Sequence, residues 1–164
     1  MDKEMSLSEK IQRFRIINAI NWYCEDWRKH DLYYTNEIIL LYLDKDKISF
    51  EDKLNKMKET VSKLEKEVKE HVPENIRKIG MPSFDCAREH LEKKIPKLEP
   101  GLELDVEYWC AISDIRGIEV LYDKELPKKG RNMTQLAYVK LIKFAIDLYG
   151  LDVKIALDGE EISD

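Results

Sequence analysis

Several signatures of familiar catalytic sites are missing from this chain of 164 residues. Its six glycines are scattered, so there is no Gly-rich loop to hold a phosphate and no GxSxG turn to expose a nucleophilic serine. Its three cysteines, Cys24, Cys86 and Cys110, lie far apart without a CxxC pair, which argues against a disulfide framework and indicates reduced, buried thiols. These absences argue against P-loop and nucleophilic catalysis, and we expect no cofactor.

A membrane-spanning segment and a basic charge balance are missing as well. The longest apolar run, Ile38–Leu43, is far shorter than the roughly 18 residues that span a bilayer, and the charged start of the chain does not resemble a secretory signal. The net charge of −5 and the pI of about 5.4 argue against a broad phosphate-binding surface. We therefore expect a cytoplasmic protein that does not enter a membrane.

The first half of the chain has the pattern of amphipathic helices. A first helix is predicted over residues 6–30, with Ser6 or Ser8 as its N-cap. The expected buried face of this helix consists of Ile11, Phe14, Ile17, Ile20, Cys24 and Trp27. Residues 35–44 fit either a short helix or a buried strand, and we favour the helix. A further helix is predicted over residues 83–95.

Residues 50–72 carry the clearest helical signal. Ser49 can cap this helix, two acids follow in the first turn, and Pro73 ends it. Apolar residues recur at intervals of three and four, as in a heptad seam: Leu54, Met57, Val61, Leu64 and Val68. A seam this short favours packing within the chain, although a contact between chains stays open.

The same part of the chain also resembles a helix-turn-helix layout. In that interpretation residues 59–71 form the recognition helix of a nucleic-acid-binding protein. The segment carries Glu59, Glu65, Glu67 and Glu70, which would face phosphates unfavourably. We favour one continuous heptad helix.

After Gly101 the apolar pattern changes from helical spacing to alternation. Residues 104–113 and 118–123 alternate on either side of the sequence DIRG, which predicts a β-hairpin. Residues 133–149 are so apolar that we expect a helix covered on more than one side, followed by a strand at 152–158. The predicted fold is α+β. A region of three to four helices at residues 1–100, including the heptad-patterned helix, packs as one unit against a ββαβ region at residues 101–164.

Four residues offer a candidate zinc site. Cys86 and His90 are separated by four positions and would share a helix face, and Cys24 and His30 could join them where the first helix ends. The alternative explanation is that Cys24 belongs to the core and that His30 lies at a helix C-terminus, where histidine is favourable. We favour this alternative and expect no bound metal.

Residues 109–158 resemble the middle of a ribonuclease H-like domain. That family has a hairpin, an asparagine-rich loop, a long apolar helix and a strand ending in an acid, in this order. The resemblance implies metal-dependent nuclease chemistry, with Asp114 and Asp158 as catalytic carboxylates. The family's glutamate ligand at the start of the helix corresponds to Gln135 here, so the implied protein would be a degenerate member acting on DNA or RNA.

The segment Asn21–Tyr34 contains many aromatic residues and bears on binding. Cys24 and Trp27 extend the predicted buried stripe, which leaves Trp22, Tyr33 and Tyr34 as candidate contact residues. We expect a non-enzymatic interaction or regulatory protein that binds another macromolecule, most simply a protein, and the sequence leaves catalysis open. The alternative is the nucleic-acid-binding or ribonuclease H-like protein described above.

Overall fold

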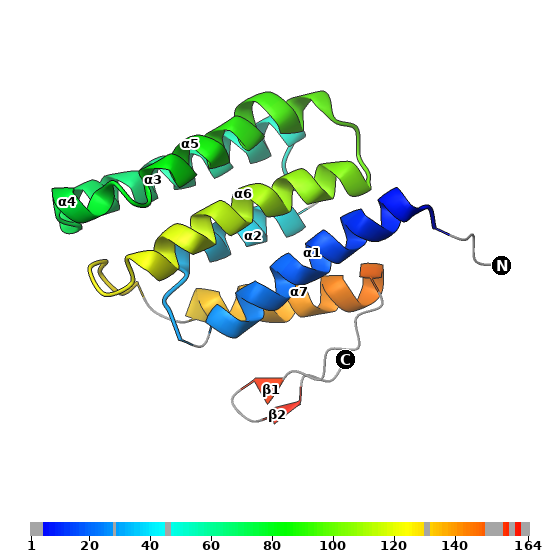
Figure 1. The fold of residues 1–164 in the computed structure, drawn as a ribbon. Helices are drawn as coiled ribbons and strands as arrows, with labels where there is room; N and C mark the ends of the chain where they lie inside the picture. Colours follow the sequence, from blue (N-terminus) through cyan, green and yellow to red (C-terminus); the bar gives the residue numbers. More distant parts are fainter. Residues whose placement is uncertain are drawn as a thin grey trace.

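The protein is built from helices in two rows, as the computed structural model in Figure 1 shows. The structure describes residues 5–27, 29–44, 47–129, 132–149, 156–157 and 160–161. Its α-helices are α1 (Leu7–Asp26), α2 (Tyr33–Leu43), α3 (Phe50–His71), α4 (Glu74–Arg77), α5 (Met81–Glu89), α6 (Leu102–Leu121) and α7 (Asn132–Tyr149). A π-helical turn, η1 (His90–Lys94), and a 3-10 turn, η2 (Ile95–Lys97), extend α5.

The helix pairs that pack together define the arrangement. One row consists of α5, α6 and α1, and the other of α3, α2 and α7 (Figure 1). Across the rows α3 packs on α5, α2 on α6 and α1 on α7, so α2 and α6 form the middle layer. Because a middle helix is covered on several sides, its buried residues are not confined to one stripe.

Local signals in the sequence explain where the two longest N-terminal helices begin. The Ser6 hydroxyl accepts a hydrogen bond from the Glu9 N–H, and the Ser49 hydroxyl accepts one from the Asp52 N–H, both at 3.1 Å. These bonds satisfy N–H groups that lack partners inside the first helical turn. The predicted N-caps at Ser6 and Ser49 are therefore confirmed.

The heptad seam of α3 packs inside the chain. All five seam residues are buried: Leu54, Met57, Val61, Leu64 and Val68. They face α2 and α5, the two helices that α3 contacts most. Arg88 of α5 adds a two-bond ion pair to Glu65 of α3, with N···O distances of 3.1 and 2.6 Å.

The predicted α+β fold is wrong, because the segment expected to form a hairpin is the single helix α6. Its buried residues extend well beyond one stripe: Leu104, Val106, Tyr108, Trp109, Ala111, Ile112, Ile115, Ile118 and Glu119. A helix buried on most sides contains stretches that alternate by chance, and Gly117 lies inside the helix rather than in a turn. The predicted helix at residues 133–149 is confirmed as α7, and it packs on the N-terminal helices α1 and α2.

The C-terminal end contains the only strands in the described part of the chain. β1 (Ala156–Leu157) and β2 (Glu160–Glu161) pair antiparallel. The predicted strand at 152–158 overlaps β1, and its other residues lie outside the described ones. Two strands of two residues do not make the expected ββαβ region. The boundary predicted at residue 100 stays a prediction.

A buried carboxylate joins α6 to the start of α2. Glu119 accepts hydrogen bonds from the Tyr34 N–H at 3.0 Å, the Thr35 N–H at 2.6 Å and the Thr35 hydroxyl at 2.5 Å. The N-cap residue of α2, Leu32, supplies no side-chain bond, so Glu119 takes the role of a cap from another helix. Burial raises the pKa of Glu119 to about 8, and the bonds from Thr35 and Tyr34 oppose that rise.

No helix in the described residues combines the length and the apolar character needed to cross a lipid bilayer.

Candidate functional site

The first helix leaves a row of large apolar side chains exposed, which we call the outer stripe. It consists of Leu7, Ile11, Phe14 and Trp22, whose exposed fractions are 75%, 51%, 63% and 56%. Intervals of four, three and eight residues place them on one side of a helix with 3.6 residues per turn. The opposite side of α1 is buried through Ile16, Ile20, Tyr23 and Trp27.

This arrangement corrects the buried face predicted for the first helix. Ile20 and Trp27 are buried as expected, and Ile17 and Cys24 are partly buried. Ile11 and Phe14 are exposed instead, because the packed side of α1 begins at Ile16. α1 therefore has apolar residues on two sides along its length, and only one side is covered by the rest of the described chain.

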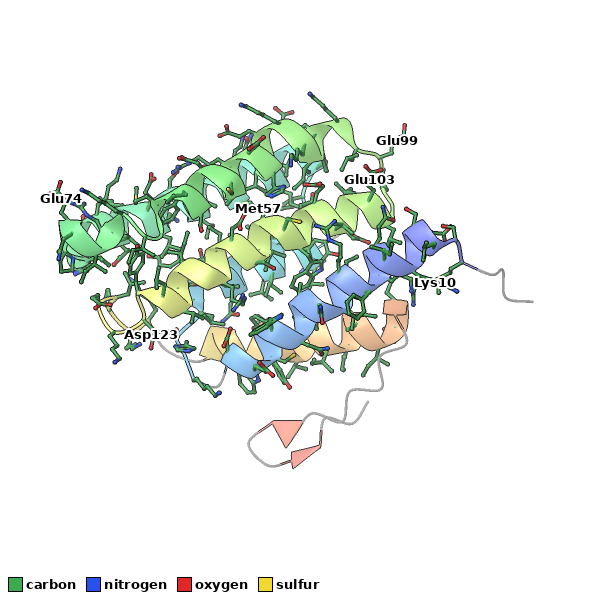
Figure 2. The ribbon with its side chains drawn as sticks, viewed as in Figure 1. Lys10, Met57, Glu74, Glu99, Glu103 and Asp123 are labelled. Atoms are coloured by element: carbon green, nitrogen blue, oxygen red, sulfur yellow. The ribbon has the colours of Figure 1, made fainter. Side chains whose placement is uncertain are left out.

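Basic side chains lie along the outer stripe. Of the charged residues between Leu7 and Trp22, Lys10 and Arg15 lie beside the stripe, whereas Arg13 and the single acid, Glu9, lie toward the other side of the helix. Figure 2 shows Lys10 near the N-terminal end of α1. Near the other end, the guanidinium carbon of Arg116 lies 5.8 Å from the centre of the Trp22 ring. Positive charge thus borders the stripe in a chain whose net charge is −5.

A cavity of about 460 Å³ lies beside the stripe, between α1 and α6. Its lining includes Arg15, Asn18 and Trp22 from α1, and Cys110, Asp114 and Arg116 from α6. His90, the first residue of the π-helical turn, also reaches it. Arg116 is fixed there by an ion pair with Asp26. The cavity therefore has both apolar walls and charged groups of both signs.

Polar groups from η1, α6 and α1 lie close together in and beside this cavity. Nδ1 of His90 lies 2.5 Å from a carboxylate oxygen of Glu107, and Nε2 lies 3.9 Å from Oδ2 of Asp114. A guanidinium nitrogen of Arg15 lies 3.7 Å from Sγ of Cys110. Burial raises the pKa of the Cys110 thiol and of the Asp114 carboxyl, and the nearby His90 opposes the rise at Asp114.

The three aromatic residues predicted to contact a partner differ in exposure. Trp22 is more than half exposed at the end of the outer stripe. Tyr33 is partly buried, and its ring packs edge-on against that of Tyr34 with 5.2 Å between ring centres. Tyr34 is 7% exposed, which leaves little of its ring for a partner. Tyr33 and Tyr34 lie in α2, away from the stripe.

The four residues of the predicted zinc site lie in different surroundings. Cys24 is partly buried, and burial raises its pKa to about 12. His30 faces Asp123 at 3.3 Å, and Cys86 is exposed. In the described residues, the group of three that could hold a metal ion contains His90 from this set, together with Glu107 and Cys110.

Of the two acids implied by the ribonuclease H-like resemblance, the described residues include only Asp114. Asp114 lies in the middle of α6 and lines the cavity, so it is not at a hairpin. Asp158 lies outside the described residues. The hairpin on which the resemblance rests is absent from residues 104–123, all of which are described and of which 104–121 belong to α6.

Sequence reasoning missed Glu107, Cys110 and Arg15 as site residues. Glu107, Cys110 and Asp114 have the spacing i, i+3, i+7, which places them on one side of a helix. This spacing can be seen in the sequence, but in a strand the same residues would not all lie on one side, so the strand interpretation hid the cluster. The contribution of His90 comes from a distant segment, and no local pattern predicts it.

Comparison of the chain with protein-family models, with curated proteins and with solved structures returns no match.

Proposed function

We propose that this protein binds a protein partner through the outer stripe of α1, and that the partner supplies an acidic amphipathic helix. The observation that carries the proposal is a row of exposed apolar side chains on one side of a helix, bordered by basic residues. A helix that binds along such a row would place its own apolar side chains between Leu7, Ile11, Phe14 and Trp22.

The size of the stripe supports a specific contact. An aromatic side chain has roughly 150–250 Å² of surface, so the exposed fractions of Phe14 and Trp22, 63% and 56%, correspond to about 180–300 Å². Leu7 and Ile11 add to this area. The largest apolar patch on a typical monomer covers about 300–600 Å² and often marks a binding site. Exposed aromatic residues also dominate the energy of many protein interfaces.

The charges around the stripe favour an acidic partner over a basic one. Lys10 and Arg15 are exposed, and each lies within one turn of Phe14. Glutamate or aspartate on the flanks of the partner helix would meet these cations, whereas lysine or arginine there would be repelled. Complementary charge of this kind speeds association and selects partners more than it adds affinity.

The same charges disfavour a second copy of this chain as the partner. In a twofold contact of α1 with itself, residues at the centre of the interface meet their own symmetry mates. The midpoint between Leu7 and Trp22 falls between Phe14 and Arg15. Two Arg15 guanidinium groups would therefore approach each other at the centre, where like charges destabilise the contact most.

A selection experiment with helical peptides tests the proposal. The outer stripe is about 22 Å long at 1.5 Å per residue, so helical peptides of about 20 residues span it. A display library of such peptides is selected on the full-length protein and depleted on the double variant Phe14→Ser/Trp22→Ser. We expect enriched peptides with apolar residues at helical spacing and an excess of Asp and Glu. They should bind the double variant at least about 10-fold more weakly.

The variant Ile79→Ser is the matched control, because it removes an apolar side chain of 68% exposure that lies outside α1. It should bind the selected peptides as the wild type does. Enrichment of peptides without acidic excess, or equal binding to the double variant, would contradict the proposal. A dimer in sedimentation that Phe14→Ser dissociates would make a second copy the partner. Tight, salt-dependent binding of a DNA duplex that needs Lys10 and Arg15 would favour nucleic acid instead.

A further inference from the structure

A cluster of potential metal ligands lies where α6 meets the π-helical turn η1. One ligand atom from each of His90, Glu107 and Cys110 lies within 4.8 Å of the other two. Glu107 and Cys110 are three positions apart on α6, and His90 is the first residue of η1. Because a π-helical turn is wider than an α-helical one, it redirects side chains, and such turns occur often at functional sites.

We propose that His90, Glu107 and Cys110 bind a divalent transition-metal ion of the zinc type. The donor set of one imidazole, one carboxylate and one thiolate matches the borderline-soft character of Zn²⁺. It does not match Mg²⁺ or Ca²⁺, which take oxygen ligands. This site is independent of the outer stripe and of the proposed partner.

The distances show how far the cluster would have to change. Zinc bonds of about 2.0–2.3 Å in a tetrahedral site place neighbouring ligand atoms about 3.3–3.8 Å apart. The ligand atoms lie within 4.8 Å of one another, so they would have to move together by at most about 1.5 Å around the ion. The 2.5 Å separation of His90 Nδ1 and Glu107 would have to open by a similar amount. Rotations of side chains on two neighbouring helical segments supply both movements.

Asp114 has the position of an outer carboxylate. A histidine that binds a metal through one ring nitrogen usually donates the other N–H to a carboxylate or carbonyl. With Nδ1 of His90 on the metal, Nε2 would face Asp114, whose Oδ2 lies 3.9 Å away. This buried oxygen has no hydrogen-bond partner in the described part of the chain. A small movement of the His90 ring toward Asp114 would satisfy it and open the Glu107 contact.

The cavity beside the cluster leaves room for a fourth ligand. His90 and Cys110 both line it, and its volume is about 460 Å³. Three protein ligands with a fourth position facing a cavity are the arrangement in which zinc holds a water molecule or an exogenous ligand. Arg15 competes with the metal, because its guanidinium lies 3.7 Å from Sγ of Cys110, but its exposed side chain can swing away.

A metal titration tests the site. The tag-free, full-length protein is first treated with a chelator, which is then removed, and is titrated with Co²⁺ alone and afterwards with Zn²⁺. We expect one equivalent of Co²⁺ to produce a thiolate-to-metal charge-transfer band, and Zn²⁺ to displace it. Cys110→Ser should abolish the band. Glu107→Gln should weaken Zn²⁺ binding by at least about 10-fold, and Asp114→Asn by about 10–100-fold as an outer partner.

Two matched controls separate the site from adventitious binding. Cys86→Ser removes the exposed cysteine four positions before His90, and Glu103→Gln removes the exposed acid one turn before Glu107 at the start of α6 (Figure 2). Neither should change the band or the affinity. Absence of saturable binding near one equivalent, a band that survives Cys110→Ser, or a loss caused equally by Cys86→Ser would overturn the proposal.

A measurement on the wild type covers the case in which a ligand variant fails to fold. Zn²⁺ should protect Cys110 from alkylation by iodoacetamide, as measured by mass spectrometry of the digested protein. Cys86 serves as the internal reference, since its labelling should not depend on Zn²⁺. Equal labelling of Cys110 with and without Zn²⁺ would contradict the proposed ligand set.

Discussion

Replacement of Gly117 by alanine should stabilise the protein, because Gly117 lies inside α6. A glycine in a helix interior destabilises by about 0.5–1 kcal/mol relative to alanine. A Cβ atom added at Gly117 meets no heavy atom within 4 Å, so no packing cost offsets this gain. Among the glycines that the structure describes, only Gly101 has a positive backbone φ angle, so Gly117 needs no conformation reserved for glycine.

The opposite result is expected at Gly80. A Cβ atom built there would lie 2.6 Å from Oη and 2.7 Å from Cε2 of Tyr122, whose side chain is fully buried. The Tyr122 hydroxyl accepts a hydrogen bond from the Gly80 N–H at 2.7 Å and donates one to the Arg77 carbonyl at 2.9 Å. Gly80→Ala must displace this ring, and overpacking of this kind costs about 1–3 kcal/mol.

Thermal and urea unfolding followed by far-UV circular dichroism measure both variants. For a chain of this size, 1 kcal/mol shifts Tm by about 2–4 °C, so Gly117→Ala should raise Tm by about 1–4 °C. Gly80→Ala should lower it by about 2–12 °C. If residues 114–117 formed the hairpin turn suggested by the sequence, alanine at position 117 would destabilise instead. A fall in Tm for Gly117→Ala would therefore refute the helical assignment of this segment.

Three further predictions concern charged and titrating groups. Because burial raises the pKa of Glu119 from 4.5 to about 8, the folded state holds a proton that the unfolded state loses between these values, so stability falls as pH rises through this range. In the wild type, the free energy of unfolding measured with urea should fall by up to about 5 kcal/mol over this pH range, and Glu119→Gln should remove that fall. An equal fall in the variant would mean that another group causes it. Dithiobis-nitrobenzoate at neutral pH should modify the exposed Cys86 at least about 100-fold faster than the partly buried Cys24, and equal rates would contradict the burial of Cys24. Arg88→Met should lower the free energy of unfolding by about 0.5–1 kcal/mol above pH 5. Because Arg88 lowers the pKa of Glu65, this loss of stability should shrink as pH falls through that lowered pKa. A loss unchanged at low pH would exclude the ion pair as its cause.

The sequence was sufficient to predict helices whose signals are local. Ser49, the acids after it and the spacing of three and four predicted α3 almost to its last residue, His71. The apolar segment at residues 133–149 predicted α7, and the helix favoured over a strand for residues 35–44 is α2. In α3 the capping group and one dominant apolar face occur in consecutive residues, so distant packing does not decide the outcome.

The failure at α6 has a definite physical cause. α6 lies in the middle layer and contacts α1, α2 and α5, so its buried residues extend well beyond one stripe. Val106, Tyr108 and Ile112 then satisfy an alternating pattern as well as a helical one, and Gly117 imitates a turn. Periodicity cannot separate a fully buried helix from buried strands. The tie from Glu119 to Tyr34 and Thr35 spans more than 80 residues and has no local signal at all.

The error in the first helix leads back to function. One apolar stripe was expected to hold both Phe14 and Trp27, but the structure separates them onto two sides of α1. A helix packed on one side needs apolar residues on that side only, so Ile11 and Phe14 contribute nothing to the described core. Polar residues at these two positions would form the same helix, because an exposed side chain adds no packing to the core. Exposed apolar side chains instead favour association with another molecule. Two of the four residues proposed to bind a partner, Ile11 and Phe14, are therefore the ones that the sequence pattern wrongly assigned to the core. Such departures from the pattern that folding requires are expected at functional sites.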